Sequence, residues 1–106
     1  MANEVQTEQQ VDVRTTIKPP SMFDVIFYND NKTHYEFVML LLMQLFGKDY
    51  DQSCELTDLI HKKGRSAVAT YTYEVAAAKR DESVSTARAN GHPLRVEIEP
   101  TDGDNT

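Results

Sequence analysis

The order in which strand-like and helical patterns follow one another constrains the fold of this chain more than any other feature. Three segments have the composition or the alternation of β-strands. Side chains in MFDVIFY alternate, so that Phe23, Val25 and Phe27 share one face, and LRVEIE alternates strictly between apolar and charged residues. SAVATYTY combines β-branched and aromatic residues, which favour a pleated sheet. We therefore predict strands over residues 22–28, 66–73 and 94–99.

Two helices are predicted between the first and the second of these strands. In the first helix, Thr33 and Glu36 have the spacing of a capping box, and Gly47 suits the position just after the helix end. Apolar residues recur between them at helical spacing, which gives the helix one face for the core. Asp51 is predicted to cap the second helix, which ends at Gly64.

A third helix, rich in alanine, is predicted from Glu74 to Ala89, and Asn90-Gly91 ends it. The element order β-α-α-β-α-β is typical of an α+β domain, here with three helices packed on a three-stranded antiparallel sheet. The chain has 106 residues, of which 40% are apolar, and this suffices for a single small domain. We place the domain at residues 21–100, with a flexible, disordered tail at 1–20 and a disordered acidic tail at 101–106.

Charge and cysteine content limit the classes of partner. The formal net charge is -6, from 17 acidic and 11 basic residues. Nucleic acids and anionic membranes are bound through basic surfaces, so we expect neither as a partner. The single cysteine, Cys54, cannot form an internal disulfide and fits a reducing compartment. Because neither a secretion signal nor an apolar run of about 20 residues is visible, we expect a cytoplasmic protein, with a monomer as the default state.

The residues that could catalyse a reaction or bind a metal lack a workable spacing. Cys54 and His61 lie seven residues apart on one predicted helix face. That spacing separates them by about 10 Å along the axis, beyond hydrogen-bond reach. His34, His61, His92 and Cys54 do not have the spacing of metal ligands. We therefore predict no enzymatic activity, no metal site and no cofactor, and we interpret Cys54 as an ordinary buried residue.

A cluster of short polar residues follows the first strand, in the stretch FYNDNKTHYEF. Asn29, Asp30, Asn31 and Thr33 can form an Asx-type turn and a helix cap. One or two such residues suffice for that, and the cluster borders a helix with an apolar face, so the others could accept hydrogen bonds from a ligand. His61 also has two interpretations, because the helix dipole favours a histidine in the last turn of a helix.

Taken together, three blocks of the sequence resemble the ClpS family, the adaptors of AAA+ Clp proteases. PPSMFDVIFYNDNKTHYEFV resembles the opening of the family pattern, and LIHKKGRSAVATYTYEVAAAK resembles its middle. ARANGHPLRVEIEP resembles the closing strand. The blocks keep their order and cover the chain from about Pro19 to Glu99, so the joint pattern is far more specific than any one block.

The resemblance implies an adaptor without catalytic activity. ClpS-like proteins bind the first residue of an N-degron substrate, by its free α-amino group and its bulky hydrophobic side chain (the N-end rule), and deliver it to a ClpA- or ClpC-type unfoldase for protein degradation. The unfoldase also engages their N-terminal tail during delivery. The residues implied are Asn29, Asp30, Asn31, Thr33 and His61 around the amino group, Tyr35, Val38, Thr57, Ile60 and Leu94 in the hydrophobic pocket, and Glu74 and Lys79 against the N-terminal domain of the unfoldase.

The chain departs from the family pattern at three positions. Asn31 stands where the family usually has a second aspartate, so one carboxylate near the amino group is missing. Tyr35 and Thr57 stand where members often have methionine, and tyrosine is the larger and stiffer side chain. The identity of the accepted first residues therefore does not follow from the resemblance. An alternative also stays open, in which the same scaffold binds the unfoldase as a competitor or regulator and delivers no substrate.

Overall fold

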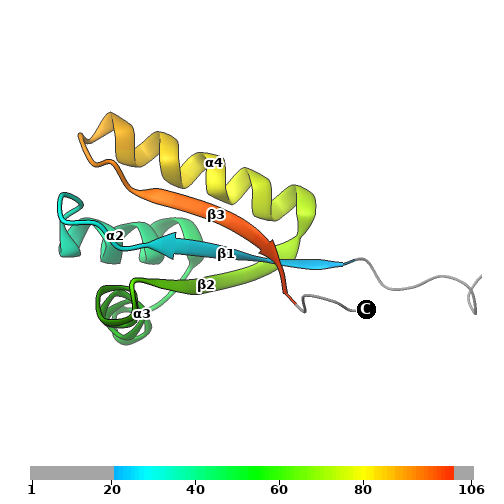
Figure 1. Ribbon diagram of the computed structural model, residues 1–106, viewed down its shortest axis with the longest axis horizontal. Helices are drawn as coiled ribbons and strands as arrows, with labels where there is room; N and C mark the ends of the chain where they lie inside the picture. The colour runs from blue at the N-terminus through cyan, green and yellow to red at the C-terminus, as the bar shows by residue number, and fades with distance from the viewer. Residues whose placement is uncertain (1–20, 102–106) are drawn as a thin grey trace, which may run out of the picture.

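The computed structural model describes residues 21–101 and confirms the predicted fold class and element order (Figure 1). The elements are β1 (Met22–Tyr28), α2 (Tyr35–Phe46), α3 (Tyr50–Lys63), β2 (Arg65–Thr72), α4 (Tyr73–Ala89) and β3 (Arg95–Pro100). Residues 1–20 and 102–106, where we predicted disordered tails, lie outside the described residues. Thr101 belongs to the described part, and its backbone N–H donates to the Met22 carbonyl oxygen over 2.9 Å. Among the helices of residues 21–101, none has the length and apolarity to cross a membrane.

β1 is the central strand of a three-stranded antiparallel sheet with the order β2-β1-β3. The last residue of β1, Tyr28, is paired with Arg65 of β2 and with Arg95 of β3. Pairing with β2 shifts between Val25 and Ile26, as in a β-bulge. The C-terminal end of β1 and the N-terminal ends of the two outer strands therefore lie at the same end of the sheet. The polar cluster begins there.

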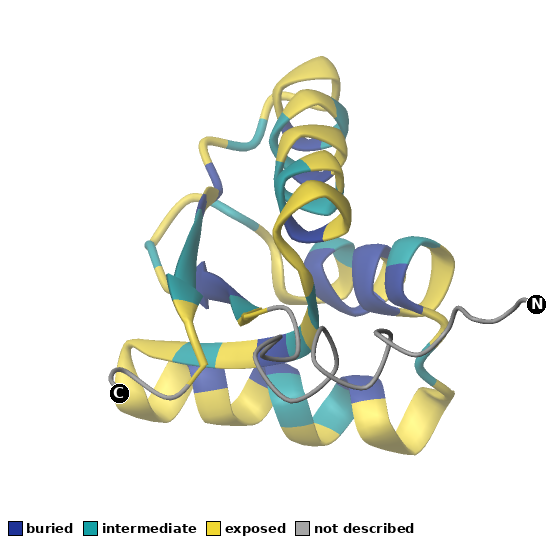
Figure 2. Cartoon of the chain, turned by 90° about the vertical axis from the view of Figure 1, so that its right-hand side faces the viewer, coloured by how far each residue is buried: buried dark blue, intermediate teal, exposed yellow. Residues whose placement is uncertain are grey.

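The three helices pack on one face of the sheet, and Figure 2 shows buried residues on the sides of the elements that face one another. Val25 and Phe27 are fully buried in a core cluster with Leu42 of α2, Ile60 of α3 and Ala76 of α4. Phe23, predicted on the same face, is partly buried against this cluster. Each large apolar side chain contributes about 1.5–3 kcal/mol by its burial, so this packing of helices against the sheet stabilises the fold.

The start of α2 differs from the prediction. The helix begins at Tyr35, and its N-cap residue, His34, makes no side-chain cap hydrogen bond. The predicted capping box of Thr33 and Glu36 is therefore wrong. The Thr33 hydroxyl instead donates to the Asp30 carboxylate over 2.8 Å, which uses it in the loop and not in the helix.

The start of α3 was predicted two residues too late. Asp49 is the N-cap, and it forms a reciprocal capping box with Gln52, with bonds of 2.8 Å and 3.0 Å. Asp51 lies in the first turn, where a negative charge still interacts favourably with the helix dipole. Both predicted helix ends are confirmed, because Gly47 and Gly64 have left-handed backbones with φ of 66° and 89°.

Candidate functional site

A cavity of about 390 Å³ lies where β1, α2 and α3 meet. All residues predicted for the polar side and for the apolar walls line it together. Tyr28 lines it as well and was not predicted, because the alternation in β1 places it on the face away from the core. Its position directly before Asn29 was the signal that could have identified it. The lining residues are Tyr28, Asn29, Asp30, Asn31, Thr33, Tyr35, Val38, Thr57, Ile60, His61 and Leu94.

Asp30 organises the loop between β1 and α2. One carboxylate oxygen accepts from the backbone N–H groups of Lys32 and Thr33, both over 2.7 Å, and the other accepts from the Thr33 hydroxyl over 2.8 Å. Partial burial alone would raise the pKa of Asp30. The hydrogen bonds from Lys32 and Thr33, with the nearby charge of His92, outweigh burial and lower that pKa below its ordinary value. The loop therefore presents a charged carboxylate whose oxygens already accept three bonds.

Asn29, Asn31 and His61 leave their side-chain polar atoms uncommitted. All three are exposed, and none of their side chains makes a hydrogen bond to another residue of the described range 21–101. The Asn29 backbone N–H donates to the Gly64 carbonyl oxygen over 2.9 Å, which fixes the loop beside the end of α3. His61 lies in the last turn of that helix, so these side chains can accept hydrogen bonds from the same ligand.

Buried side chains form the apolar part of the cavity. Val38, Thr57, Ile60 and Leu94 are all buried, and all except Thr57 belong to the core cluster. The Thr57 hydroxyl donates to the Ser53 carbonyl oxygen over 2.7 Å within α3. Its proton is thus used within the helix, and Thr57 adds no hydrogen-bond donor to the cavity. This side of the cavity suits an apolar group.

Tyr35 bridges the two helices at the edge of the cavity. It lies in the first turn of α2, and its hydroxyl donates to the Asp58 carboxylate of α3 over 2.6 Å. This bond, together with partial burial and the negative charge of Asp58, raises the pKa of Tyr35 to about 12. The ring is held toward α3 by its hydroxyl, and the cavity stays open beside it.

Two histidine rings lie edge to face near the start of α2, where His34 is the N-cap residue. The ring centres of His34 and His92 are 5.0 Å apart, and His92 packs against Phe37 at 4.3 Å.

Cys54 is half-buried, not fully buried as interpreted from the sequence, and its sulfur lies 3.8 Å from that of Met39. Within residues 21–101, no three histidine, cysteine, aspartate or glutamate side chains come together in a way that could hold a metal ion.

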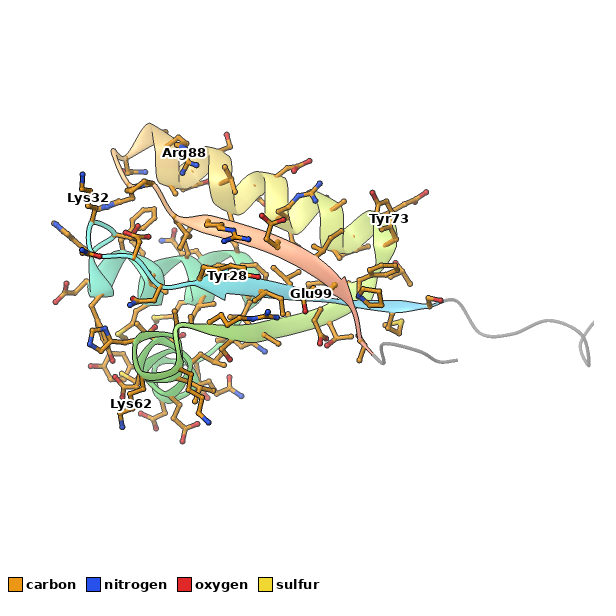
Figure 3. The ribbon with its side chains drawn as sticks, viewed as in Figure 1. Tyr28, Lys32, Lys62, Tyr73, Arg88 and Glu99 are labelled. Atoms are coloured by element: carbon orange, nitrogen blue, oxygen red, sulfur yellow. The ribbon has the colours of Figure 1, made fainter. Side chains whose placement is uncertain are left out.

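Glu74 and Lys79, predicted to contact an unfoldase, lie on α4 away from the cavity. Glu74 is exposed in the first turn of α4. Figure 3 places Tyr73, at the start of α4, and Lys32, in the loop, at opposite ends of the domain. Lys79 is half-buried, and its ammonium group donates to the Leu45 carbonyl oxygen near the end of α2 over 2.6 Å. Lys79 thus has a structural role, which sequence patterns could not reveal.

Comparison with known sequences gives a family match along most of the domain. The family model described as ATP-dependent Clp protease adaptor protein ClpS matches residues 18–97. The ATP-dependent Clp protease adapter protein ClpS of Paraburkholderia phymatum is 36% identical over 83 residues, which cover 78% of this chain and 80% of that protein. The protein of the same name from Burkholderia thailandensis matches with the same identity and coverage.

A solved structure has the same fold. The structure of Agrobacterium tumefaciens ClpS2 bound to L-phenylalaninamide matches with a TM-score of 0.75 and 27% sequence identity. The match covers 77% of this chain and 99% of that one. The ligand of that protein has a free α-amino group and a phenylalanine side chain, with an amide in place of the carboxylate.

Proposed function

Because the chain belongs to the ClpS family of ATP-dependent Clp protease adaptor proteins, we propose that its cavity binds the first residue of a substrate protein. The observation that carries this proposal is that a polar side and an apolar side share one cavity of about 390 Å³. The polar side receives the free α-amino group, and the apolar side receives a bulky hydrophobic side chain. The amide ligand of the Agrobacterium relative has both of these groups.

The polar side is suited to an ammonium group. Such a group has three donors and needs acceptors that an apolar wall cannot provide. The Asn29 amide oxygen and one nitrogen of neutral His61 can accept, and the charge of Asp30 favours a cation nearby. Charge-assisted hydrogen bonds of this kind contribute about 1.5–3 kcal/mol each. Asn31 contributes an amide dipole without a charge, and Thr33 acts through Asp30.

The apolar side adds a term of similar size. Burial of a large hydrophobic side chain against Val38, Ile60 and Leu94 contributes about 1.5–3 kcal/mol. After the entropic cost of association, affinity in the micromolar range is reasonable for a site of this size. Because the two terms are independent, a ligand that lacks either group should bind weakly.

We propose that the bound substrate is delivered to the N-terminal domain of a ClpA- or ClpC-type AAA+ unfoldase. Glu74 supports this docking role by its exposure, whereas Lys79 would act chiefly by fixing α4 against α2. The segment 1–20 would serve as the tail that the unfoldase engages. In this proposal the adaptor is a cytoplasmic monomer without enzymatic activity. The competitor function remains the second candidate, because Asn31 lacks a charge and Tyr35 is tied across the cavity edge.

Short peptides test the binding proposal directly. Peptides that begin with Phe, Leu, Tyr or Trp are titrated with a free and with an acetylated N-terminus. Acetylation removes the positive charge and leaves a single N–H, so affinity should fall at least tenfold, which is about 1.4 kcal/mol. Equal affinities would contradict the proposal and favour the competitor.

The role of His61 is tested with a matched pair of variants. His61→Ala should weaken binding of the free-amine peptide and leave the fold intact, whereas His34→Ala should change neither, because His34 does not line the cavity. If His61→Ala unfolds the domain, the residue has a structural role.

A separate truncation tests delivery. Removal of residues 1–18 should preserve peptide affinity and abolish degradation of the substrate by the unfoldase and its protease.

A further inference from the structure

A row of three side chains continues from the cavity onto the outer face of the sheet. Tyr28 lines the cavity, and its partners across the sheet are Arg65 on one side and Arg95 on the other. Residues directly opposite in neighbouring strands point to the same side of a sheet. The guanidinium carbons lie 5.3 Å (Arg65) and 4.0 Å (Arg95) from the centre of the Tyr28 ring. The ring of a cavity-lining tyrosine is therefore in contact with two positively charged side chains.

The acidic partners of these arginines stand farther along the same face. Arg65 pairs with Glu99 over 2.7 Å, and Arg95 pairs with Glu97 over 3.2 Å. Figure 3 shows the labelled Tyr28 and Glu99 over the strands of the sheet, with Glu99 farther from the loop. All four charged side chains are about half-exposed. Exposed ion pairs of this kind contribute little, so a ligand carboxylate can replace either glutamate.

The side chains of these arginines and glutamates also cover the rest of the outer face of the sheet. Ile26, which lies between the row and Asp24 on β1, is paired with Ala67 and Glu97 and is only 4% exposed. It lies outside the core cluster, so its cover comes from long side chains on the outer face. The arginines thus lie over the outer face of the sheet with exposed charged ends, Arg95 nearer the Tyr28 ring and Arg65 reaching toward Glu99.

The positions of the negative charges at the cavity make this row distinctive. The Asp30 carboxylate already accepts three hydrogen bonds, and Asp58 accepts from Tyr35. In a chain with a net charge of -6, two guanidinium groups lie around the Tyr28 ring, and each is paired with an exposed glutamate that a ligand carboxylate can replace.

We propose that Tyr28, Arg65 and Arg95 form a second subsite that takes an acidic side chain from the second or the third residue of the substrate. This inference rests on the proposed function, since the first residue must occupy the cavity. In this proposal the chain leaves the cavity past Tyr28, and because an extended chain advances about 3.3 Å per residue, its next two residues come within reach of the row. Because their side chains point to opposite sides, only one of the two faces the row.

The test uses free-amine peptides that differ in one residue. Phe-Glu-Ala-Ser-Ala is compared with Phe-Gln-Ala-Ser-Ala, and Phe-Ala-Glu-Ser-Ala with Phe-Ala-Gln-Ser-Ala. At one of the two positions, glutamate should bind about threefold or more tightly than glutamine at low salt, and added salt should reduce the difference. The net charge of the protein alone would favour the opposite order, so a preference for glutamate requires a local cause.

Variants locate that cause. Arg95→Gln should remove most of the preference, and Arg65→Gln should remove less, because its guanidinium is farther from the Tyr28 ring. Arg80→Gln is the matched control: it makes the same change in net charge on α4, where Arg80 pairs with Asp81, and should keep the full preference. Arg95→Lys keeps the charge and should retain part of the preference.

The outcomes separate the two proposals. Equal binding of glutamate and glutamine at both positions, or a preference that survives in both Gln variants of Arg65 and Arg95, overturns the second subsite. If an acetylated Phe-Gln peptide binds as well as the free one, the proposed function itself has failed. Loss of the glutamate preference in Arg80→Gln would assign the effect to net charge and would also overturn the subsite.

Discussion

The two sides of the cavity are held in place by different interactions. Val38, Ile60 and Leu94 on the apolar side also belong to the core cluster, so packing fixes them. The polar side is a loop whose shape depends on one carboxylate, Asp30, and its bonds to the backbone and hydroxyl of Thr33. A change on the apolar side must therefore alter stability and binding together, whereas changes on the polar side can separate the two.

The largest effect is expected on the apolar side. Leu94→Ala should lower the free energy of unfolding by about 2–5 kcal/mol, because Leu94 is buried and its removal leaves a cavity in the core. Urea denaturation measures this loss. Ile60→Val is the milder variant, with an expected loss of about 0.5–1.5 kcal/mol, and it keeps the protein folded for peptide titration.

Both variants should also weaken peptides that begin with a bulky hydrophobic residue. If Leu94→Ala reduced peptide affinity without any loss of stability, the cavity wall would be independent of the core. The conclusion that changes on the apolar side alter stability and binding together would then be wrong.

The polar side should give a smaller effect that falls on binding. Asn29→Ala should weaken free-amine peptides about tenfold or more and leave the free energy of unfolding within about 0.5 kcal/mol, because its side chain bonds to no other described residue. Asp30→Asn should lower both quantities, the stability by about 1 kcal/mol or more, because the carboxylate accepts from Lys32 and Thr33. Isothermal titration and urea denaturation of the two variants give the comparison.

The free energy of unfolding, followed as the pH is lowered, should also distinguish the structural role of Asp30 from the binding role of Asn29. This falling part of the curve is its acid limb. The pKa of Asp30 is lower in the folded protein than its ordinary value. The ionised carboxylate therefore stabilises the fold at any pH above the ordinary pKa, and this stabilisation is lost as the pH falls through the pKa of the folded state. Asp30→Asn should flatten this limb, and Asn29→Ala should leave it unchanged. An acid limb that is identical in both variants would contradict the structural role of Asp30.

Local rules predicted the burial of the residues on the apolar side, whereas their place in one cavity was implied by the family resemblance. The helical spacing on α2 and α3 puts Val38 and Ile60 on the core face, and the left-handed glycines Gly47 and Gly64 end both helices where expected. Local rules also identified the polar cluster, but they left its members with two interpretations each. The structure assigns Asp30 to the turn and, within the described residues, leaves the Asn29 side chain without a hydrogen-bond partner.

The contacts that could not be predicted join residues far apart in the chain. Tyr35 bonds to Asp58 of another helix, and Lys79 bonds to a carbonyl oxygen near the end of α2. No spacing rule relates such partners, because their distance depends on how the helices pack. Tyr28 was missed for a related reason: alternation assigns a side chain to a face of the sheet and does not show where that face borders a cavity.

The smallest expected effect concerns the bridge between the two sides. Tyr35→Phe keeps the ring and removes the hydroxyl that bonds to Asp58, so the ring is no longer held toward α3. The ratio of affinities for peptides that begin with Phe and with Leu should change by about twofold to fivefold, since small differences in pocket shape have small energies. Stability should change little, because the bond is exposed.

Alkaline titration tests the same bond without a ligand. The pKa of Tyr35 is raised to about 12 by its hydrogen bond to Asp58, by burial and by the negative charge of Asp58. The bond therefore stabilises the fold at any pH below the ordinary pKa of tyrosine, and this stabilisation is lost as the pH rises toward 12. The latest part of the absorbance change of ionised tyrosine should be lost in Tyr35→Phe and move to lower pH in Asp58→Asn, whereas the contributions of Tyr50 and Tyr71, whose pKa values are also raised, should remain. If Asp58→Asn shifted neither this transition nor the Phe-to-Leu ratio, the bridge would not shape the cavity, and selectivity for the first residue would depend on the buried wall alone.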